Sequence, residues 1–433
     1  MKRKTKIITS SAFVIVLVVI LTVTILNIPN IKVGIMLKKN DFYELNTYYP
    51  TVETNVNPML GLMAKAINGS NFNDYPTANK AIDDLLENYS DQLGESNIVS
   101  FAGLKLANLF VSSQYVKFNK LLQAYSKEMT LDESFQSIAQ ICKLLADVPE
   151  LKVSVPAKDI EIPVSFKKRG RGEIIYLNAF MNGHEEEFAF DTGAMKWNLT
   201  TDSIAKANGF EIICDSFNVS GITGSGICKI GILNHMNIKD IEISNAVFII
   251  IPDSMSTHKL DDGSIVKIEN VLGTDIMKLL KEVQIESKTG KMIVPFKQTE
   301  NPDKKQNFMC KTGNYMLYLS VNDEMTQMDF DTGNAKTQMF KNYYNKHATF
   351  IDRNGKRGKG QQGGFGGLRE VEHIILPVLT CRLFTNSCVL KNVEVVLDDY
   401  KLQEGEYGTI GIDFIRAFDK VIINFENMFV SVK

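Results

Sequence analysis

The strongest constraint on the fold of this chain is an internal repeat whose two copies each carry an Asp-Thr-Gly triplet. The first triplet begins at Asp191 and the second at Asp331, 140 positions later. Each triplet follows an apolar, β-forming run. Each is then followed by a glycine-rich segment and by an apolar-Gly-x-Asp turn that ends at Asp275 or Asp413. Because order, spacing and residue type agree between the copies, the repeat predicts two matching β-rich lobes within one chain.

The two triplets have the chemistry of a paired-carboxylate site. Loops that leave matching strands would bring Asp191 and Asp331 to a common pseudo-twofold axis. Two carboxylates that close cannot both ionise cheaply, so they share a proton. One then acts as the base that deprotonates a water, and the other as the acid that protonates the carbonyl oxygen under attack. This chemistry needs no cofactor, and the scattered histidines and cysteines predict no metal site.

The residues beside the two aspartates are predicted to support them. Glycine after Asp-Thr permits a tight turn and a close approach of the two loops. The threonine hydroxyls can donate and accept hydrogen bonds across the axis. Asp275 and Asp413 are predicted to be structural, capping short helices. The predicted supporting residues are Thr192, Gly193, Ala194, Thr332, Gly333 and Asn334.

The glycine-rich segments 221–226 and 360–367 are predicted to be hairpin tips that close over an extended peptide. Such lids depend on backbone mobility and backbone hydrogen bonds more than on side chains. The expected flap and substrate-binding residues are Gly221, Ile222, Thr223, Gly224, Gly363, Gly364 and Phe365. The basic stretch 356–364 resembles a phosphate-binding loop only loosely, because it lacks the Gly-Lys-Ser/Thr ending and the strand-loop-helix context.

At Phe190-Asp191-Thr192-Gly193-Ala194 and Phe330-Asp331-Thr332-Gly333 the sequence resembles the pepsin and retropepsin group of aspartic proteases. It is most similar to the bacterial, single-chain, two-lobed retropepsin-like members, over residues 172–433. The resemblance implies a mostly β fold of two lobes with a cleft between them and a flap at residues 219–226. It also implies an aspartic endopeptidase that acts on protein or peptide substrates. Because both lobes lie in one chain, the protease unit is expected to be monomeric.

Two features differ from the pepsin-like pattern. Asn334 follows the second triplet where the family usually has Ala, Ser or Thr. The first glycine-rich segment contains no tyrosine, which favours the retropepsin-like type. Two alternatives to a peptidase remain open. One is a protein of the same fold that binds peptide with weak or no catalysis. The other is an interaction protein whose helical segment binds a partner while the β part is a scaffold.

The chain before the β region predicts a small helical domain. Residues 58–150 carry apolar side chains at helical spacing and predict an antiparallel all-α domain with some likeness to tetratricopeptide hairpins. One such stripe consists of Ala78, Ala81, Ile82 and Leu85. Residues 29–57 are mixed and Asn-rich and predict a connector. The first β lobe is predicted to span residues 151–300 and the second residues 301–433.

The N-terminus predicts attachment to a membrane. Residues 1–6 include four basic residues and precede an uncharged, apolar run over residues 7–28. This length and the flanking charge predict a transmembrane signal-anchor with a cytoplasmic start and an extracytoplasmic body, periplasmic or at the cell surface. A cleaved signal peptide is the alternative, and it would make the protein secreted. The formal net charge of −2 shows no basic surplus, so no nucleic-acid partner is expected.

The extracytoplasmic location would permit disulfides. Cys214 and Cys228 lie nearly symmetrically about the first glycine-rich segment, and Cys381 and Cys388 flank a short turn-like segment. Either pair could bridge a hairpin. Buried free thiols are an equally compatible interpretation, because cysteine is among the residues most often buried.

Overall fold

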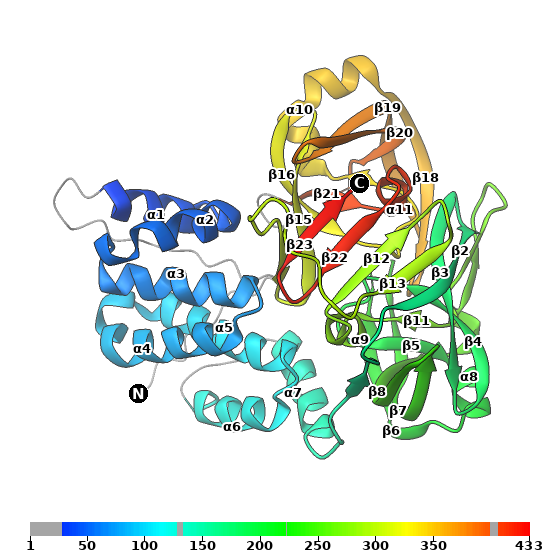
Figure 1. The fold of residues 1–433 in the computed structure, drawn as a ribbon, viewed down its shortest axis with the longest axis horizontal. Helices are drawn as coiled ribbons and strands as arrows, with labels where there is room; N and C mark the ends of the chain where they lie inside the picture. Colours follow the sequence, from blue (N-terminus) through cyan, green and yellow to red (C-terminus); the bar gives the residue numbers. More distant parts are fainter. Residues whose placement is uncertain (1–27, 128–132, 222, 399–405) are drawn as a thin grey trace. The chain divides into compact units, whose positions relative to one another are not determined.

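The computed structural model describes residues 28–127, 133–221, 223–398 and 406–433 (Figure 1). The chain divides into two compact units. One contains Met1–Val148 with Met309–Gly313, and the other contains Pro149–Phe308 with Asn314–Lys433. The predicted cytoplasmic start and the signal-anchor lie outside the described residues, apart from the last anchor residue, Ile28. In the described part of the chain, no helix has both the length and the apolar character needed to cross a membrane.

Apart from Met309–Gly313, the first unit is helical, as Figure 1 shows in blue and cyan. Its elements are α1 (Ile28–Lys38), α2 (Phe42–Val52), η1 (Glu53–Asn55), α3 (Pro58–Asn71), α4 (Tyr75–Leu93), α5 (Glu95–Val111), α6 (Tyr115–Tyr125) and α7 (Glu133–Leu145). The prediction of a connector at residues 29–57 is wrong, because α1 and α2 occupy most of this segment. Val33 and Leu37 are buried on one face of α1, and Leu45 and Tyr49 on one face of α2. This i, i+4 spacing is that of one buried helix face.

Successive helices of this unit pack against one another as an array of hairpins. The stripe predicted on α4 is buried at Ala78 and Ile82. Gly69 of α3 permits the close approach of α4, because a Cβ at this position would lie 2.9 Å from the Cβ of Ala78. Asp74 caps α4, its carboxylate accepting the Thr77 N–H at 3.2 Å. The likeness to tetratricopeptide hairpins stays a prediction.

The second unit is mostly β and has two lobes built from equivalent strands. The first lobe contains β1 (Lys152–Ser154), β3 (Gly172–Met181), β4 (His184–Phe190), β5 (Asn198–Thr201), β6 (Glu211–Ser220), β7 (Ser225–Ile238), β8 (Ile241–Ile251), β9 (Thr257–Lys259), β10 (Ile265–Lys267) and β11 (Val271–Leu272). The second contains β14 (Phe308–Lys311), β15 (Asn314–Val321), β16 (Glu324–Phe330), β17 (Gln338–Met339), β18 (Lys356–Gly364), β19 (Gly367–Leu383), β20 (Asn386–Val396) and β21 (Glu406–Ile410).

The two lobes repeat the same strand pairings. β11 is parallel to β4 as β21 is to β16, and β8 is parallel to β5 as β20 is to β17. A short helix follows each parallel strand, α9 (Thr274–Leu279) after β11 and α11 (Ile412–Arg416) after β21. A helix also follows the triplet in each lobe: α8 (Asp202–Ala207) in the first and the longer α10 (Lys341–Asn354) in the second. The repeat seen in the sequence is therefore a repeat of topology.

The lobes share one sheet, so they are not divided cleanly by sequence. This sheet has the order β23-β22-β12-β13-β2, with β22 beside β12 (Figure 1). The C-terminal hairpin thus pairs with strands from the first half of the repeat. The strand bounds are β2 (Ile160–Arg169), β12 (Glu282–Glu286), β13 (Lys291–Val294), β22 (Val421–Asn424) and β23 (Phe429–Val432).

No disulfide joins the described cysteines. Cys214 and Cys228 do not face each other, because irregularities in β6 place Ile230 opposite Cys214 and Phe217 opposite Cys228. Cys381 and Cys388 lie directly opposite on β19 and β20. A hydrogen bond with Cys388 and burial raise the pKa of the Cys381 thiol well above its ordinary value.

Candidate active site

The structure brings the two Asp-Thr-Gly triplets into contact. Asp191 directly follows β4, and Asp331 directly follows β16. Each is held by the parallel strand beside it: the Asp191 N–H donates to the Leu272 carbonyl at 3.3 Å, and the Asp331 N–H donates to the Ile410 carbonyl at 3.0 Å. The two aspartates therefore occupy equivalent positions at the ends of equivalent strands.

The glycine of each triplet lies against the carboxyl group of the other. A Cβ on Gly193 would be 2.5 Å from Cγ of Asp331, and a Cβ on Gly333 would overlap the Asp191 carboxyl group. No side chain fits at either position. Each carboxyl group therefore lies directly against the loop that carries the other aspartate. Glycine is thus needed here for close approach rather than for a special backbone conformation.

The two threonines cross-link the loops in a symmetric pattern of four hydrogen bonds. The Thr192 hydroxyl donates to the Phe330 carbonyl at 2.6 Å, and the Thr332 hydroxyl donates to the Phe190 carbonyl at 2.6 Å. Each hydroxyl also accepts the backbone N–H of the other threonine, at 2.9 and 3.0 Å. Thr192 and Thr332 are 2% and 1% exposed, so these bonds are shielded from water. They fix the distance between the aspartate loops.

Backbone N–H groups orient each carboxylate in the same way. Asp191 Oδ1 accepts from Gly193 at 2.8 Å and Ala194 at 3.1 Å. Asp331 Oδ1 accepts from Gly333 at 2.8 Å and Asn334 at 3.1 Å. Asn334, which departs from the family pattern, therefore makes the same backbone contact as Ala194. The contact is made by the Asn334 backbone, so the asparagine side chain does not alter the hydrogen bonds to the Asp331 carboxylate.

The environment of the pair favours a proton on Asp331. Burial raises the pKa of Asp331 well above its ordinary value, and the charge of Asp191 and the hydrogen bond with its carboxyl group raise it further. The Gly333 N–H opposes this rise without cancelling it. The environment thus favours the protonated form of Asp331, as is expected where two carboxyl groups lie close together.

The predicted flap residues lie at two hairpin tips that touch each other. Residues 221–224 connect β6 to β7, and residues 365–366 connect β18 to β19. The Thr223 hydroxyl donates to the Phe365 carbonyl at 2.7 Å, and a Cβ on Gly224 would lie 2.7 Å from the Gly366 carbonyl oxygen. Gly363 and Gly364 end β18 just before its tip, whereas Ile222 lies outside the described residues. Each lobe therefore contributes one hairpin to a contact that bridges the lobes.

A further hairpin, β9–β10, braces the second flap and was not predicted. The Asp261 N–H donates to Gln361 Oε1 at 3.0 Å, and Val266 packs against the bare backbone of Gly363. The Asp262-Gly263 pair at the turn, with Gly263 at φ 80°, is a recognisable hairpin signal. The hairpin was not predicted from the sequence because its two strands have only three residues each.

Asp275 and Asp413 tie the short helices to the loops that follow the triplets. Asp275 pairs with Lys196 at 3.3 Å, and both side chains are almost fully buried. Asp413 accepts from the N–H and the hydroxyl of Thr337 at 2.8 and 2.7 Å. The predicted structural role fits these contacts, but the predicted capping does not, because Gly273 and Gly411 occupy the N-cap positions. Sequence reasoning missed Lys196 and Thr337.

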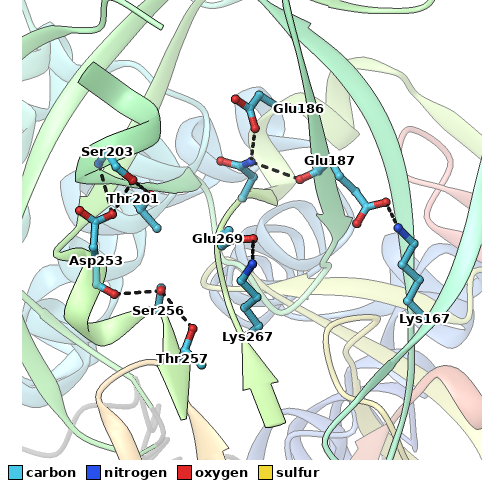
Figure 2. A network of polar contacts seen from close by, with 11 residues as sticks. Lys167, Glu186, Glu187, Thr201, Ser203, Asp253, Ser256, Thr257, Lys267 and Glu269 are labelled. Carbon is cyan, nitrogen blue, oxygen red and sulfur yellow. Dashed lines mark hydrogen bonds and ion pairs between the residues drawn. The ribbon is translucent and has the colours of Figure 1, made fainter. Parts of the chain in front are cut away.

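Polar contacts also support the strand that leads to Asp191 (Figure 2). Asn270 is buried and donates to the Glu187 carbonyl of β4 at 3.2 Å, while Thr200 donates to Asn270 Oδ1 at 2.7 Å. Figure 2 also shows Glu187 paired with Lys167. These contacts join β4, β5 and the segment before β11, which together position the first aspartate loop.

No protein-family model and no curated protein sequence matches this chain. Among solved structures, it is similar to a retropepsin-like aspartic protease from Rickettsia conorii, at 22% identity over 33% of this chain and 92% of that chain, with a TM-score of 0.22. It is also similar to an aspartic proteinase from Irpex lacteus, at 10% identity over 63% and 96%, with a TM-score of 0.41. Basic 7S globulin from soybean matches at 9% identity over 64% and 95%, with a TM-score of 0.38. At these TM-scores none of the similarities decides what this chain does.

The described residues contain no group of three or more His, Cys, Asp or Glu side chains arranged to hold a metal ion. The polar groups that converge at the site are two carboxyls, two hydroxyls and six backbone N–H groups. Such a set can hold and transfer protons.

Proposed function

We propose that this protein is an aspartic endopeptidase that hydrolyses peptide bonds with a water activated between Asp191 and Asp331. The observation that carries the proposal is the symmetric pair of Asp-Thr-Gly loops, cross-bonded through Thr192 and Thr332, with each carboxyl group against the glycine of the opposite loop. This arrangement holds one proton between two acids, which is what general acid–base hydrolysis requires.

The roles of the two carboxyls follow from the raised pKa of Asp331. Asp331 carries the shared proton, and the ionised Asp191 accepts a proton from the water. The water oxygen then bonds to the carbonyl carbon while Asp331 donates its proton to the carbonyl oxygen. Collapse of this tetrahedral species breaks the C–N bond. The proton taken up by Asp191 passes to the leaving nitrogen, and one hydroxyl of the tetrahedral species returns its proton to Asp331 as the carbonyl group of the acid product forms. No covalent enzyme intermediate forms.

The substrate proposed is an extended peptide that runs between the aspartate loops and the two flap tips. The touching tips at Thr223 and Phe365 must separate to admit it. Glycine at 221, 224, 363 and 366 leaves backbone groups free of side-chain cover, so the tips can bond to any peptide backbone. Because both aspartates belong to one chain, the proposed catalytic unit is a monomer.

The test is cleavage of an unfolded protein by the purified full chain, compared with Asp191→Asn and Asp331→Asn. Each variant is expected to lose activity by about 100-fold to 10,000-fold, because each removes one acid–base partner. Pepstatin is expected to inhibit the wild type. Unchanged cleavage by Asp191→Asn would sink the proposal. Peptide binding without cleavage by the wild type would instead identify a binding protein of the same fold.

We also propose that residues 7–28 anchor the protein in a membrane with its body outside the cytoplasm, because they are apolar, uncharged and preceded by basic residues. Alkaline carbonate extraction of cell membranes tests this. A full chain that stays in the pellet supports the anchor. A shortened chain in the medium would show cleavage and secretion.

A further inference from the structure

The two lobes differ at one pair of equivalent positions beside the aspartate loops. In the first lobe, Asn198 of β5 lies opposite Phe248 of β8. In the second lobe, Gln338 of β17 lies opposite Glu394 of β20 in the equivalent parallel pairing. Asn198 and Gln338 each follow their catalytic aspartate by seven positions. The internal symmetry of the fold thus allows a direct comparison.

The first-lobe position is filled by packed aromatic groups. Phe248 is fully buried, and its ring lies 5.0 Å from that of Phe210 and 6.3 Å from that of Phe188. Asn198 is also buried, and its amide bonds to the Gly273 N–H and the Val247 carbonyl. Both of these first-lobe side chains are committed to the core or to the backbone, so neither faces a ligand.

The second-lobe position is polar and connected to the flap. Gln338 Nε2 donates to Glu394 Oε2 at 3.3 Å, and Gln362 Nε2 of β18 donates to Gln338 Oε1 at 3.0 Å. Arg171, from the tip between β2 and β3, approaches Glu394 at 3.6 Å. The Glu394 side chain is 17% exposed, and its two recorded contacts are both long, so its carboxylate keeps capacity to accept further hydrogen bonds.

Strand alternation places another polar group on the same face. Glu394 lies opposite Ile375, and His373 lies two positions from Ile375 on β19, so both side chains point to one side of the sheet. His373 is 5% exposed, and its Nδ1 has no hydrogen-bond partner among the described residues. A Cβ on Gly360 would be 2.9 Å from the His373 ring and 3.0 Å from Arg171 Nη1. His373 and Arg171 therefore lie close to each other, both against Gly360 of β18.

The charge of this cluster is negative overall. Arg171 is its cation, and its Nε is already paired with Asp262 at 2.7 Å. The carboxylates of Asp261, Asp262 and Glu394 all raise the pKa of Arg171, which shows that they act on the same small region. Three carboxylates against one guanidinium leave an excess of negative charge, so the cluster favours a cationic group over an anionic one.

We propose that Glu394, Gln338 and Gln362 form a subsite that accepts a basic side chain of the substrate, Lys or Arg, on the second-lobe side of the scissile bond. The inference rests on the proposed peptidase function and adds a substrate class to it. The ammonium or guanidinium group bonds to Glu394, and the two glutamine amides bond to its remaining donors and to the substrate backbone. Because the first lobe has Phe248 at the equivalent position, cleavage preference is unequal on the two sides of the scissile bond.

The test is a positional-scanning library of quenched fluorescent peptides, cleaved by the full-length wild type and by Glu394→Gln. The wild type is expected to favour Lys or Arg at one position, and Glu394→Gln to lower kcat/KM for those peptides about tenfold or more relative to norleucine peptides. The matched control is Glu372→Gln, an exposed carboxylate on the other face of the same sheet, which should retain the preference. Tryptophan fluorescence verifies that each variant is folded.

A second experiment measures peptide binding, so that the subsite proposal can be tested separately from the proposed peptidase activity. Two labelled peptides that differ only by Lys or norleucine are titrated with Asp191→Asn, and again with Asp191→Asn/Glu394→Gln. The Lys peptide is expected to bind about tenfold tighter to the first variant, and the difference should vanish in the second. Lys-dependent binding by a wild type that cleaves nothing would support the subsite while overturning the peptidase. Cleavage with no basic preference, or a preference that survives Glu394→Gln, would overturn the subsite alone.

Discussion

Replacing Thr332 by valine tests whether the cross-bonded threonines hold the two lobes together. Valine keeps the volume of threonine but removes a hydroxyl that donates to the Phe190 carbonyl at 2.6 Å and accepts the Thr192 N–H at 2.9 Å. Both partners are buried backbone groups that would be left without these bonds. Each such loss costs about 1–3 kcal/mol, so Thr332→Val is expected to lower the free energy of unfolding by about 2–6 kcal/mol.

Thr332→Ser is the matched control. Serine keeps the hydroxyl and loses one methyl group, which costs about 1 kcal/mol. The assay is urea denaturation followed by fluorescence. Trp197 is the only tryptophan in the chain and is largely buried six residues after Asp191, so it reports on this loop directly. Serine is also expected to keep peptidase activity where valine loses most of it.

The double variant Thr192→Val/Thr332→Val sharpens the test. Because the two hydroxyls belong to one network, its cost should be clearly less than the sum of the two single costs. Equal losses from Thr332→Val and Thr332→Ser would refute the reasoning. Strictly additive losses in the double variant would show instead that the two hydroxyls act independently, contrary to the reciprocal bonds.

Three further predictions concern Asp331 of the carboxyl pair, the buried Lys196 that contacts Asp275, and Thr223 at the hairpin tip. The raised pKa of Asp331 means that its contribution to stability is present below the unfolded pKa of about 4 and is lost as pH rises through the folded value. Asp331→Asn should therefore flatten the fall in stability measured by urea titration from pH 4 upward. Lys196→Met should cost about 3 kcal/mol in the same assay, the low end for breaking a buried pair, because Lys278 still contacts Asp275 at 2.6 Å. Thr223→Val removes a hydrogen bond worth about 1 kcal/mol between the flap tips, and should lower kcat/KM by no more than about tenfold in peptide cleavage.

Each of these expectations has an outcome that contradicts it. If the stability of Asp331→Asn fell with rising pH as steeply as that of the wild type, the fall would be due to a group other than Asp331. A neutral Lys196→Met would mean that the buried pair contributes nothing to the fold. A complete loss of activity in Thr223→Val, with the fold intact, would mean that the threonine does more than join the tips.

Much of the paired-aspartate site could be foreseen, because the two triplets repeat within one chain. Asp191 and Asp331 are 140 positions apart, and the turns at Asp275 and Asp413 repeat at the nearly equal spacing of 138 positions, with α9 and α11 at those turns. Local chemistry predicted the tight approach at the triplet glycines and the hydrogen bonds of the threonines. These features depend on residue type and on positions a few residues apart, which a sequence displays directly.

Other parts of the site arise from contacts between distant segments. Lys196 is an ordinary lysine in the sequence, and only the position of α9 makes it the buried partner of Asp275. The contact of the β9–β10 hairpin with the tip of the β18–β19 hairpin depends on the tertiary positions of both. Strands of only three residues are too short to show a recognisable alternation of apolar and polar residues in the sequence. The pairing of β22 with β12 likewise joins segments about 140 positions apart. The sequence of neither strand indicates which strand it pairs with.

The sequence alone thus determined that two equivalent loops each carry an aspartate, since an internal repeat is visible whatever the fold. The tertiary structure decided that each carboxyl group lies against the glycine of the opposite loop, that burial raises the pKa of Asp331, and that the two lobes are chemically unequal at Phe248 and Glu394. The physical reason is that burial, electrostatic coupling and strand register are properties of neighbours in space. Neighbours in space are set by long-range packing, which residue spacing along the chain does not record.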